Sequence, residues 1–98
     1  MKNIFITRKI PEIGMKMLIE KGYTIDINPK DRPLTKKELM KILKKKEYFA
    51  VLTLLTDIID AEVMDIAPTV KIYANYAIGF NNINIAEAKK RNIYVTNT

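Results

Sequence analysis

The segment ANYAIGFNNIN, residues 74–84, is the part of the sequence best suited to chemistry. It contains Gly79, one of only three glycines, between an apolar run and a stretch with helical spacing. A glycine allows a positive φ or a close approach of a ligand to the main chain. Successive N–H groups ahead of a helix form a concave anion site. Spacing alone also fits a simple strand-to-helix turn, so both interpretations stay open here.

Several residue types that carry common chemistries are missing. The chain has no cysteine, histidine or serine, which excludes disulfides, thiolate metal sites and serine nucleophiles. The first strand-to-helix connection, TRKIPEIG, lacks the glycines of a phosphate-binding loop, and Arg8 stands where a phospho-acceptor domain would want an acidic residue. We interpret the acidic residues Asp57, Asp60, Glu62 and Asp65 as helix caps and solvated charges rather than metal ligands.

Positive charge dominates the sequence, with 17 basic and 11 acidic residues and a net charge of +6. The lysines concentrate in residues 35–46, TKKELMKILKKK, whose spacing favours a solvated helix face. The alternative is a basic binding module for nucleic acid or an acidic partner, suggested by KKKEYF at residues 44–49. The lack of cysteine fits a reducing cytoplasm, and we expect no membrane partner, because no apolar run reaches about 20 residues.

Alternating patterns predict five strands and four helices. Apolar or alternating runs predict strands at residues 3–7, 23–27, 49–55, 70–74 and 93–96. Helices are expected from Pro11 to Gly22, after the capping box of Thr35 and Glu38, over 61–67 behind Asp60, and over 84–91. This order predicts an α/β fold with a flavodoxin-like parallel sheet, strand order 2-1-3-4-5 in three layers. Ligands would bind at the carboxyl ends of the strands.

The predicted fifth strand ends at Thr96, near the end of the 98 residues. A doubly wound domain normally adds one more helix, so we expect the final covering helix to be lacking and one sheet face to be open. An open apolar face favours self-association, which predicts a homodimer. The other explanation is that the chain is the front part of a longer protein.

The sequence also resembles a known family. The opening NIFITRKIPEIGMKML and the segment LLTDIIDAEVMDIAPTVKIYANYAIGFNNINIAEAKKRNIYVTNT are similar to the amino-terminal part of D-isomer-specific 2-hydroxyacid dehydrogenases, closest to the glyoxylate/hydroxypyruvate reductase branch. Five positions depart from the family pattern: Ile78 stands for Val, Phe80 for Tyr, Asn81 and Asn84 for Asp, and Asn92 for Gly. Asparagine tolerates the left-handed conformation that glycine would adopt at position 92.

The resemblance implies a function for residues 74–84. Family members transfer a hydride between NAD(P)H and a small 2-keto acid such as glyoxylate or hydroxypyruvate. By resemblance, the N–H groups of Ile78 and Gly79 bind the substrate carboxylate, Leu55 lines the pocket, and Asn75 and Tyr76 shape the loop.

The resemblance also implies what lies elsewhere. The family's substrate domain is discontinuous, and its cofactor domain carries the dinucleotide glycines. We expect residues 1–98 to be one partial substrate-binding domain without the Rossmann cofactor domain. The catalytic Arg, His and carboxylate of the family then come later, so this chain has no catalytic residue, binds neither NAD nor NADP, and is inactive alone.

Overall fold

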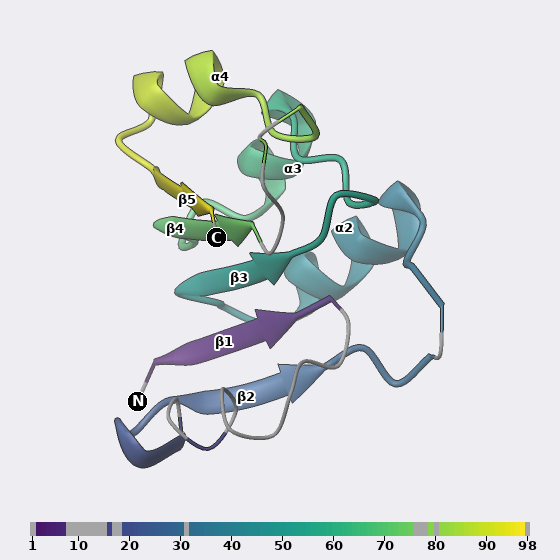
Figure 1. Cartoon of the computed structure of the whole chain (residues 1–98), viewed down its shortest axis with the longest axis vertical. Coiled ribbons are helices and arrows are strands. Elements are labelled where there is room, and N and C mark those ends of the chain that lie inside the picture. Colours follow the sequence, from purple (N-terminus) through teal and green to yellow (C-terminus); the bar gives the residue numbers. More distant parts are fainter. Residues whose placement is uncertain are drawn as a thin grey trace.

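The sheet runs through the whole molecule. The computed structural model describes residues 2–7, 16, 19–30, 32–75, 79 and 81–97. Five strands lie in the order β2-β1-β3-β4-β5, and every neighbouring pair is parallel (Figure 1). This confirms the predicted α/β topology. The strands are β1 (Asn3–Ile6), β2 (Thr24–Ile27), β3 (Ala50–Thr53), β4 (Ile72–Asn75) and β5 (Tyr94–Asn97).

The end of β3 differs from its prediction. The apolar run predicted a strand over residues 49–55, but the ladder ends at Thr53 and Leu55 lies in the following turn. Leu55 is 58% exposed. The apolar pattern overruns the strand because the last leucine turns away from the sheet.

Local capping determines where the helices begin. Three helices lie wholly within the described residues: α2 (Lys36–Lys45), α3 (Ala61–Ile66) and α4 (Ile85–Lys90). Thr35 and Glu38 form the predicted capping box, and Asp60 accepts a hydrogen bond from the Val63 N–H. Asn84 caps α4 in the same way, so the cap survives with asparagine in place of the family's aspartate.

The turns before β2 and β5 need unusual backbone conformations. Gly22 has φ 88° and Asn92 has φ 57°, as expected for a helix stop and a left-handed turn. Most of the first predicted helix lies outside the described residues; Lys16, Ile19 and Glu20 are helical. None of the helices in the described part of the chain is both long and apolar enough to span a membrane.

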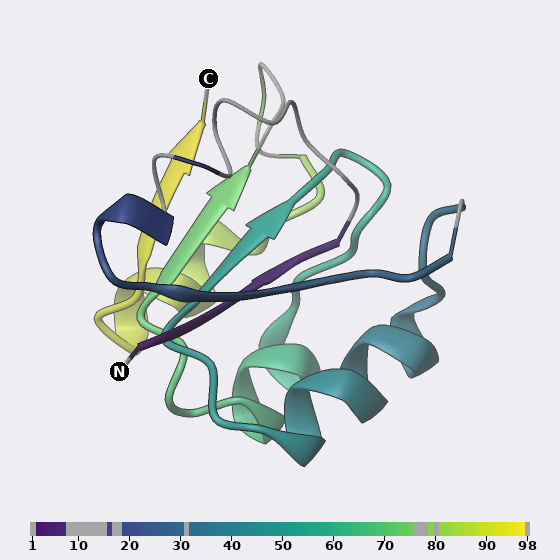
Figure 2. The same ribbon diagram turned by 90° about the horizontal axis from the view of Figure 1, so that it is seen from below.

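The main core lies between the sheet and helices α2, α3 and α4, and Figure 2 shows α2 and α3 along one side of the strands. Leu39, Val63 and Ala88 of the helices pack on alternate strand residues, among them Val51 and Tyr73. Burial on the other face is graded. Ile4, Ile6 and Ala50 are buried there. Leu52 and Ile72 are partly exposed, and Tyr94 on β5 is 71% exposed.

Candidate functional site

Buried polar side chains gather at one edge of the sheet. Each of the buried Thr, Asn and Asp residues in the described part of the chain ends a strand or follows one. They are Thr7, Asn28, Thr53, Asp57 and Asn75. Burial of a polar group is unfavourable unless a hydrogen bond replaces the lost water. These residues therefore need partners, and their partners define the site.

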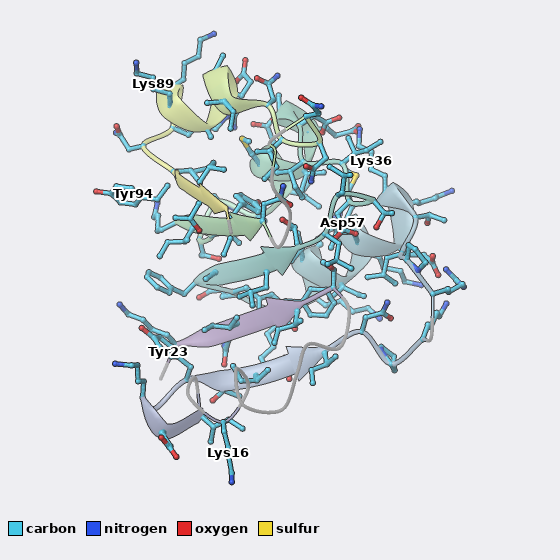
Figure 3. The ribbon with its side chains drawn as sticks, viewed as in Figure 1. Lys16, Tyr23, Lys36, Asp57, Lys89 and Tyr94 are labelled. Atoms are coloured by element: carbon cyan, nitrogen blue, oxygen red, sulfur yellow. The ribbon has the colours of Figure 1, made fainter. Side chains whose placement is uncertain are left out.

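Asp57 ties the ends of β1 and β3 together. The Thr7 hydroxyl donates to Asp57 Oδ2 at 2.5 Å, and the Leu54 N–H donates to the same oxygen at 2.7 Å. Asp57 is only 2% exposed, so its interpretation as a solvated charge is wrong. Figure 3 shows Asp57 at the carboxyl end of β3. Its carboxylate holds this turn in place. No cluster of three or more metal-ligating side chains occurs among the described residues.

Asn75 ends β4 and reaches three neighbours. Its Oδ1 accepts a hydrogen bond from the Thr53 hydroxyl at 2.8 Å. Its Nδ2 donates to the Gly79 carbonyl at 2.8 Å and to Asn82 Oδ1 at 2.9 Å. Asn75 is 1% exposed. The side chain therefore sets the path of the main chain at Gly79 from inside the molecule.

Asn82 was missed by the sequence interpretation. Its Nδ2 donates to the Asp57 carbonyl at 2.7 Å, to the Leu54 carbonyl at 3.0 Å and to Asn75 Oδ1 at 3.2 Å. The sequence offers three asparagines close together, at positions 81, 82 and 84. No spacing rule separates the residue that turns inward from its neighbours.

None of the described residues crowds Gly79. Its φ lies outside the left-handed region, so the positive-φ explanation is wrong. A Cβ added there would meet no atom within 4 Å. This open space would admit the close approach of a ligand to the main chain.

Some predicted site residues are connected by this hydrogen-bond network, and the others lie outside the described residues. The network joins Asn75 to Gly79 directly, and it joins both to the Leu54 carbonyl, one residue before exposed Leu55. Tyr76 and Ile78 lie outside the described residues.

The site is an exposed edge of the sheet. A hollow of about 370 Å³ lies at the opposite edge, where α2 and α3 end, and holds no predicted site residue.

Several charged side chains at this edge form ion pairs with one another. Glu38 binds both Arg32 and Lys30, which hold the pKa of its carboxyl well below the usual range. Lys36 pairs with Asp60 and Glu62. In the described part of the site, main-chain N–H groups are thus the better candidates for binding an anion than these cations.

Comparison with known proteins decides the family. The model of the family described as "D-isomer specific 2-hydroxyacid dehydrogenase, catalytic domain" matches residues 4–98. The chain belongs to this family. It is 50% identical over 97 residues to a glyoxylate reductase of Thermococcus litoralis and 47% identical over 95 residues to one of Pyrococcus horikoshii.

The relatives are much longer. The chain is covered to 97% in both comparisons but spans only 28% of the length of either reductase. The crystal structure of the TT0316 protein from Thermus thermophilus superposes with a TM-score of 0.86 at 30% identity, covering 95% of this chain and 29% of that one. The parallel sheet described above is therefore shared with part of that crystal structure.

The glycines of this chain do not have the spacing of a dinucleotide-binding loop. A dinucleotide-binding loop needs closely spaced glycines between a strand and a helix. The glycines here are Gly14, Gly22 and Gly79, and Gly22 lies in a turn that enters β2 at the edge away from the site. Gly79 stands alone at the carboxyl edge. We therefore assign no cofactor-binding residue to this chain.

Proposed function

We propose that the chain is the substrate-binding part of an NAD(P)-dependent D-2-hydroxyacid dehydrogenase, which transfers a hydride between a nicotinamide cofactor and a small 2-keto acid such as glyoxylate or hydroxypyruvate. The observation that carries the proposal is the open space in front of Gly79 at the carboxyl edge of the sheet. Buried Asn75 holds the Gly79 carbonyl there through a hydrogen bond. The names of the similar proteins support the choice of glyoxylate.

The chain's contribution is binding and orientation. The N–H groups of Ile78 and Gly79 hold the substrate carboxylate, Leu55 forms an apolar wall, and Asn75 and Tyr76 shape the loop. Hydrogen bonds to a charged group contribute about 1.5–3 kcal/mol each. Such bonds hold substrate and transition state alike, so they fix the position of the 2-keto carbon without themselves accelerating hydride transfer.

Proton transfer and cofactor binding belong to other parts of the parent enzyme. The chain contains no histidine, the family's proton donor by resemblance. We therefore propose that residues 1–98 form one partial substrate-binding domain that neither binds NAD or NADP nor reduces glyoxylate alone. Turnover by the purified 98-residue chain would contradict this. We place the protein in the cytoplasm and expect a homodimer, which sedimentation would test.

Oxalate titration tests the binding site. Oxalate carries the carboxylates of the proposed ligand class and is not reduced. In a nuclear magnetic resonance titration of the 15N-labelled chain, we expect the Gly79 amide to shift, with a Kd in about the millimolar range. Oxamide, which has no carboxylate, is the control and should leave the amide unmoved. An unmoved Gly79 amide at saturating oxalate would refute the carboxylate site.

A chimera tests the reaction. Residues 1–98 replace the matching segment of the Thermococcus litoralis glyoxylate reductase, which is 50% identical to it. We expect the chimera to oxidise NADH or NADPH in the presence of glyoxylate, and parallel assays give the cofactor preference and the choice between glyoxylate and hydroxypyruvate. A folded chimera that binds cofactor but reduces neither substrate would contradict the proposed function.

A further inference from the structure

We propose that Asn82 is a positioning residue that holds the two halves of the carboxylate site in register. The proposal rests on the proposed function, because the halves are the Leu55 turn and the Gly79 segment. They are separated along the chain, and the ladder of β3 and β4 ends before either of them, at Thr53 and Asn75. Something beyond the sheet must therefore fix their separation.

The Asn82 side chain makes this connection. Its amide nitrogen donates to the carbonyls of Leu54 and Asp57, which belong to the turn that carries Leu55. Its amide oxygen accepts from Asn75 Nδ2, the group that also holds the Gly79 carbonyl. One side chain thus contacts the turn directly and the Gly79 segment through a single intermediate.

The main chain of Asn82 strengthens the same connection. Its carbonyl accepts a hydrogen bond from the Ile59 N–H at 2.9 Å, and the Asn84 N–H donates to the Ile59 carbonyl at 2.8 Å. The two segments therefore run side by side at Ile59 and Ile83, where a parallel bridge forms. Asn82 lies at the start of this bridge, so hydrogen bonds of its main chain fix the position from which its side chain extends.

Asparagine is the side chain of this length that offers two N–H donors and an acceptor together. Its two N–H groups serve the two carbonyls at 2.7 and 3.0 Å and are shared with Asn75 Oδ1 at 3.2 Å. The two main-chain carbonyls can only accept, so the side chain must offer an N–H group, and Asn75 Nδ2 needs an acceptor. Asn75 and Asn82 also donate to each other, at 2.9 and 3.2 Å. An aspartate would lose the donors and place negative charge against two carbonyl oxygens.

The effect on binding comes through Gly79. A glycine has more backbone freedom than any other residue, and that freedom is lost when a ligand binds its N–H. The Asn75 bond to the Gly79 carbonyl restricts that freedom in advance, and Asn82 fixes Asn75. Binding is then stronger because less ordering remains to be done.

Four variants of the 98-residue chain test the inference by oxalate titration. Asn82→Ala removes the donors and acceptor, and Asn82→Asp keeps the size of the side chain. Asn81→Ala, at an exposed neighbour, and Asn84→Asp, which keeps an N-cap and adds the same charge, are the matched controls. We expect both Asn82 variants to weaken oxalate binding by about tenfold or more while folded, and the controls to stay within about threefold.

Folding is measured for each variant by amide shift dispersion. If either Asn82 variant is folded and binds oxalate as the wild type does, the inference is wrong and the proposed function stands. If the wild type itself leaves Gly79 unmoved, the proposed function fails first. The two failures are therefore distinguishable.

A measurement on the wild type covers the case in which neither Asn82 variant folds. The side-chain amide protons of Asn82 should exchange slowly with water and shift on addition of oxalate, because they belong to the held network. Those of exposed Asn81 give the fast reference. Fast exchange at Asn82, or protons that ignore oxalate while the Gly79 amide shifts, would overturn the proposal.

Discussion

The amino and carboxyl edges of the sheet differ in the burial of their polar side chains and in the backbone conformation of their glycines. At the amino edge, where the strands begin, the polar side chains are exposed lysines and the turns take left-handed conformations at Gly22 and Asn92. Exposed lysines come shortly before every strand: Lys2, Lys21, Lys44, Lys45, Lys46, Lys71, Lys89 and Lys90. At the carboxyl edge, by contrast, five polar side chains are buried and hydrogen-bonded, beside a rim of exposed ion pairs.

The difference separates residues that the fold explains from residues that it does not. Left-handed φ values explain Gly22 and Asn92, and lysines at helix carboxyl ends complement the helix dipole. At the carboxyl edge, the fold supplies no reason for glycine at position 79, where a side chain would find open space. Under the proposed function, the bound substrate carboxylate supplies that reason.

The largest effect should come from Asp57. Asp57→Ala leaves the Thr7 hydroxyl and the Leu54 N–H without their buried acceptor. Two hydrogen bonds to a charged group correspond to roughly 3–6 kcal/mol of unfolding free energy, a large part of the 5–15 kcal/mol of a typical domain. Urea unfolding measures the loss. Asp65→Ala, an exposed carboxylate near the opposite edge, is the control, and equal effects would remove the contrast between the edges.

Gly22 and Gly79 give the most direct contrast. An added Cβ meets no atom within 4 Å at either glycine, so only the backbone conformation differs. Gly22→Ala should lower the unfolding free energy by roughly 1–2 kcal/mol, because φ is 88°. Gly79→Ala should raise it by about 0.4–1 kcal/mol, because alanine restricts the unfolded chain.

Binding should reverse that order. The new methyl group in Gly79→Ala occupies the space in front of the amides, so we expect oxalate to bind at least about tenfold more weakly. Gly22→Ala, once folded, should bind as the wild type does. A destabilised Gly79→Ala variant with normal oxalate binding would make Gly79 a structural glycine like Gly22.

Local patterns predicted most of the fold. The strand order followed from alternating strands and helices, and the caps at Thr35 and Asp60 followed from residue type and position. Each of these depends on a few neighbouring residues, which is why a single sequence was sufficient.

The site was predicted only in part. Position and resemblance pointed to Asn75 and Gly79, but not to the bonds that hold them. Thr7 and Asp57 are 50 residues apart, and Asn82 meets Leu54 across 28. Such pairs depend on how far each loop extends past the sheet. Residue types do not encode that, as the early end of β3 before Leu55 shows.

Acid should affect the exposed pairs of the carboxyl edge and spare its amide network. Arg32 and Lys30 hold the pKa of Glu38 below its ordinary value of 4.5. The unfolded chain therefore takes up this proton first, so the stabilisation is complete above pH 4.5 and is lost as the pH falls below it. Melting temperatures between about pH 6 and about pH 3 should decline less in Glu38→Gln than in the wild type. Salt should reduce the difference, because the pairs are exposed.

Asn75 and Asn82 carry no titratable group, so their contribution should not change over this range. Glu20→Gln, which removes an exposed charge elsewhere, should decline as the wild type does. If Glu38→Gln and wild type declined in parallel, the ion pairs of Glu38 would contribute nothing to stability.

The smallest effect should come from the lysines of the amino edge. Lys44→Gln with Lys45→Gln removes two exposed cations from the last turn of α2. The unfolding free energy should fall by less than about 1 kcal/mol, the size of a screened helix-dipole interaction, and oxalate should bind as before. The same variant decides the alternative function of a basic binding module. Tight, salt-sensitive binding of the wild type to duplex DNA that the variant loses would make the amino edge a binding surface. Both edges would then bind anions, one through main-chain N–H groups and the other through lysine side chains. Location at the carboxyl edge would no longer distinguish residues that bind a ligand from residues that only stabilise the fold.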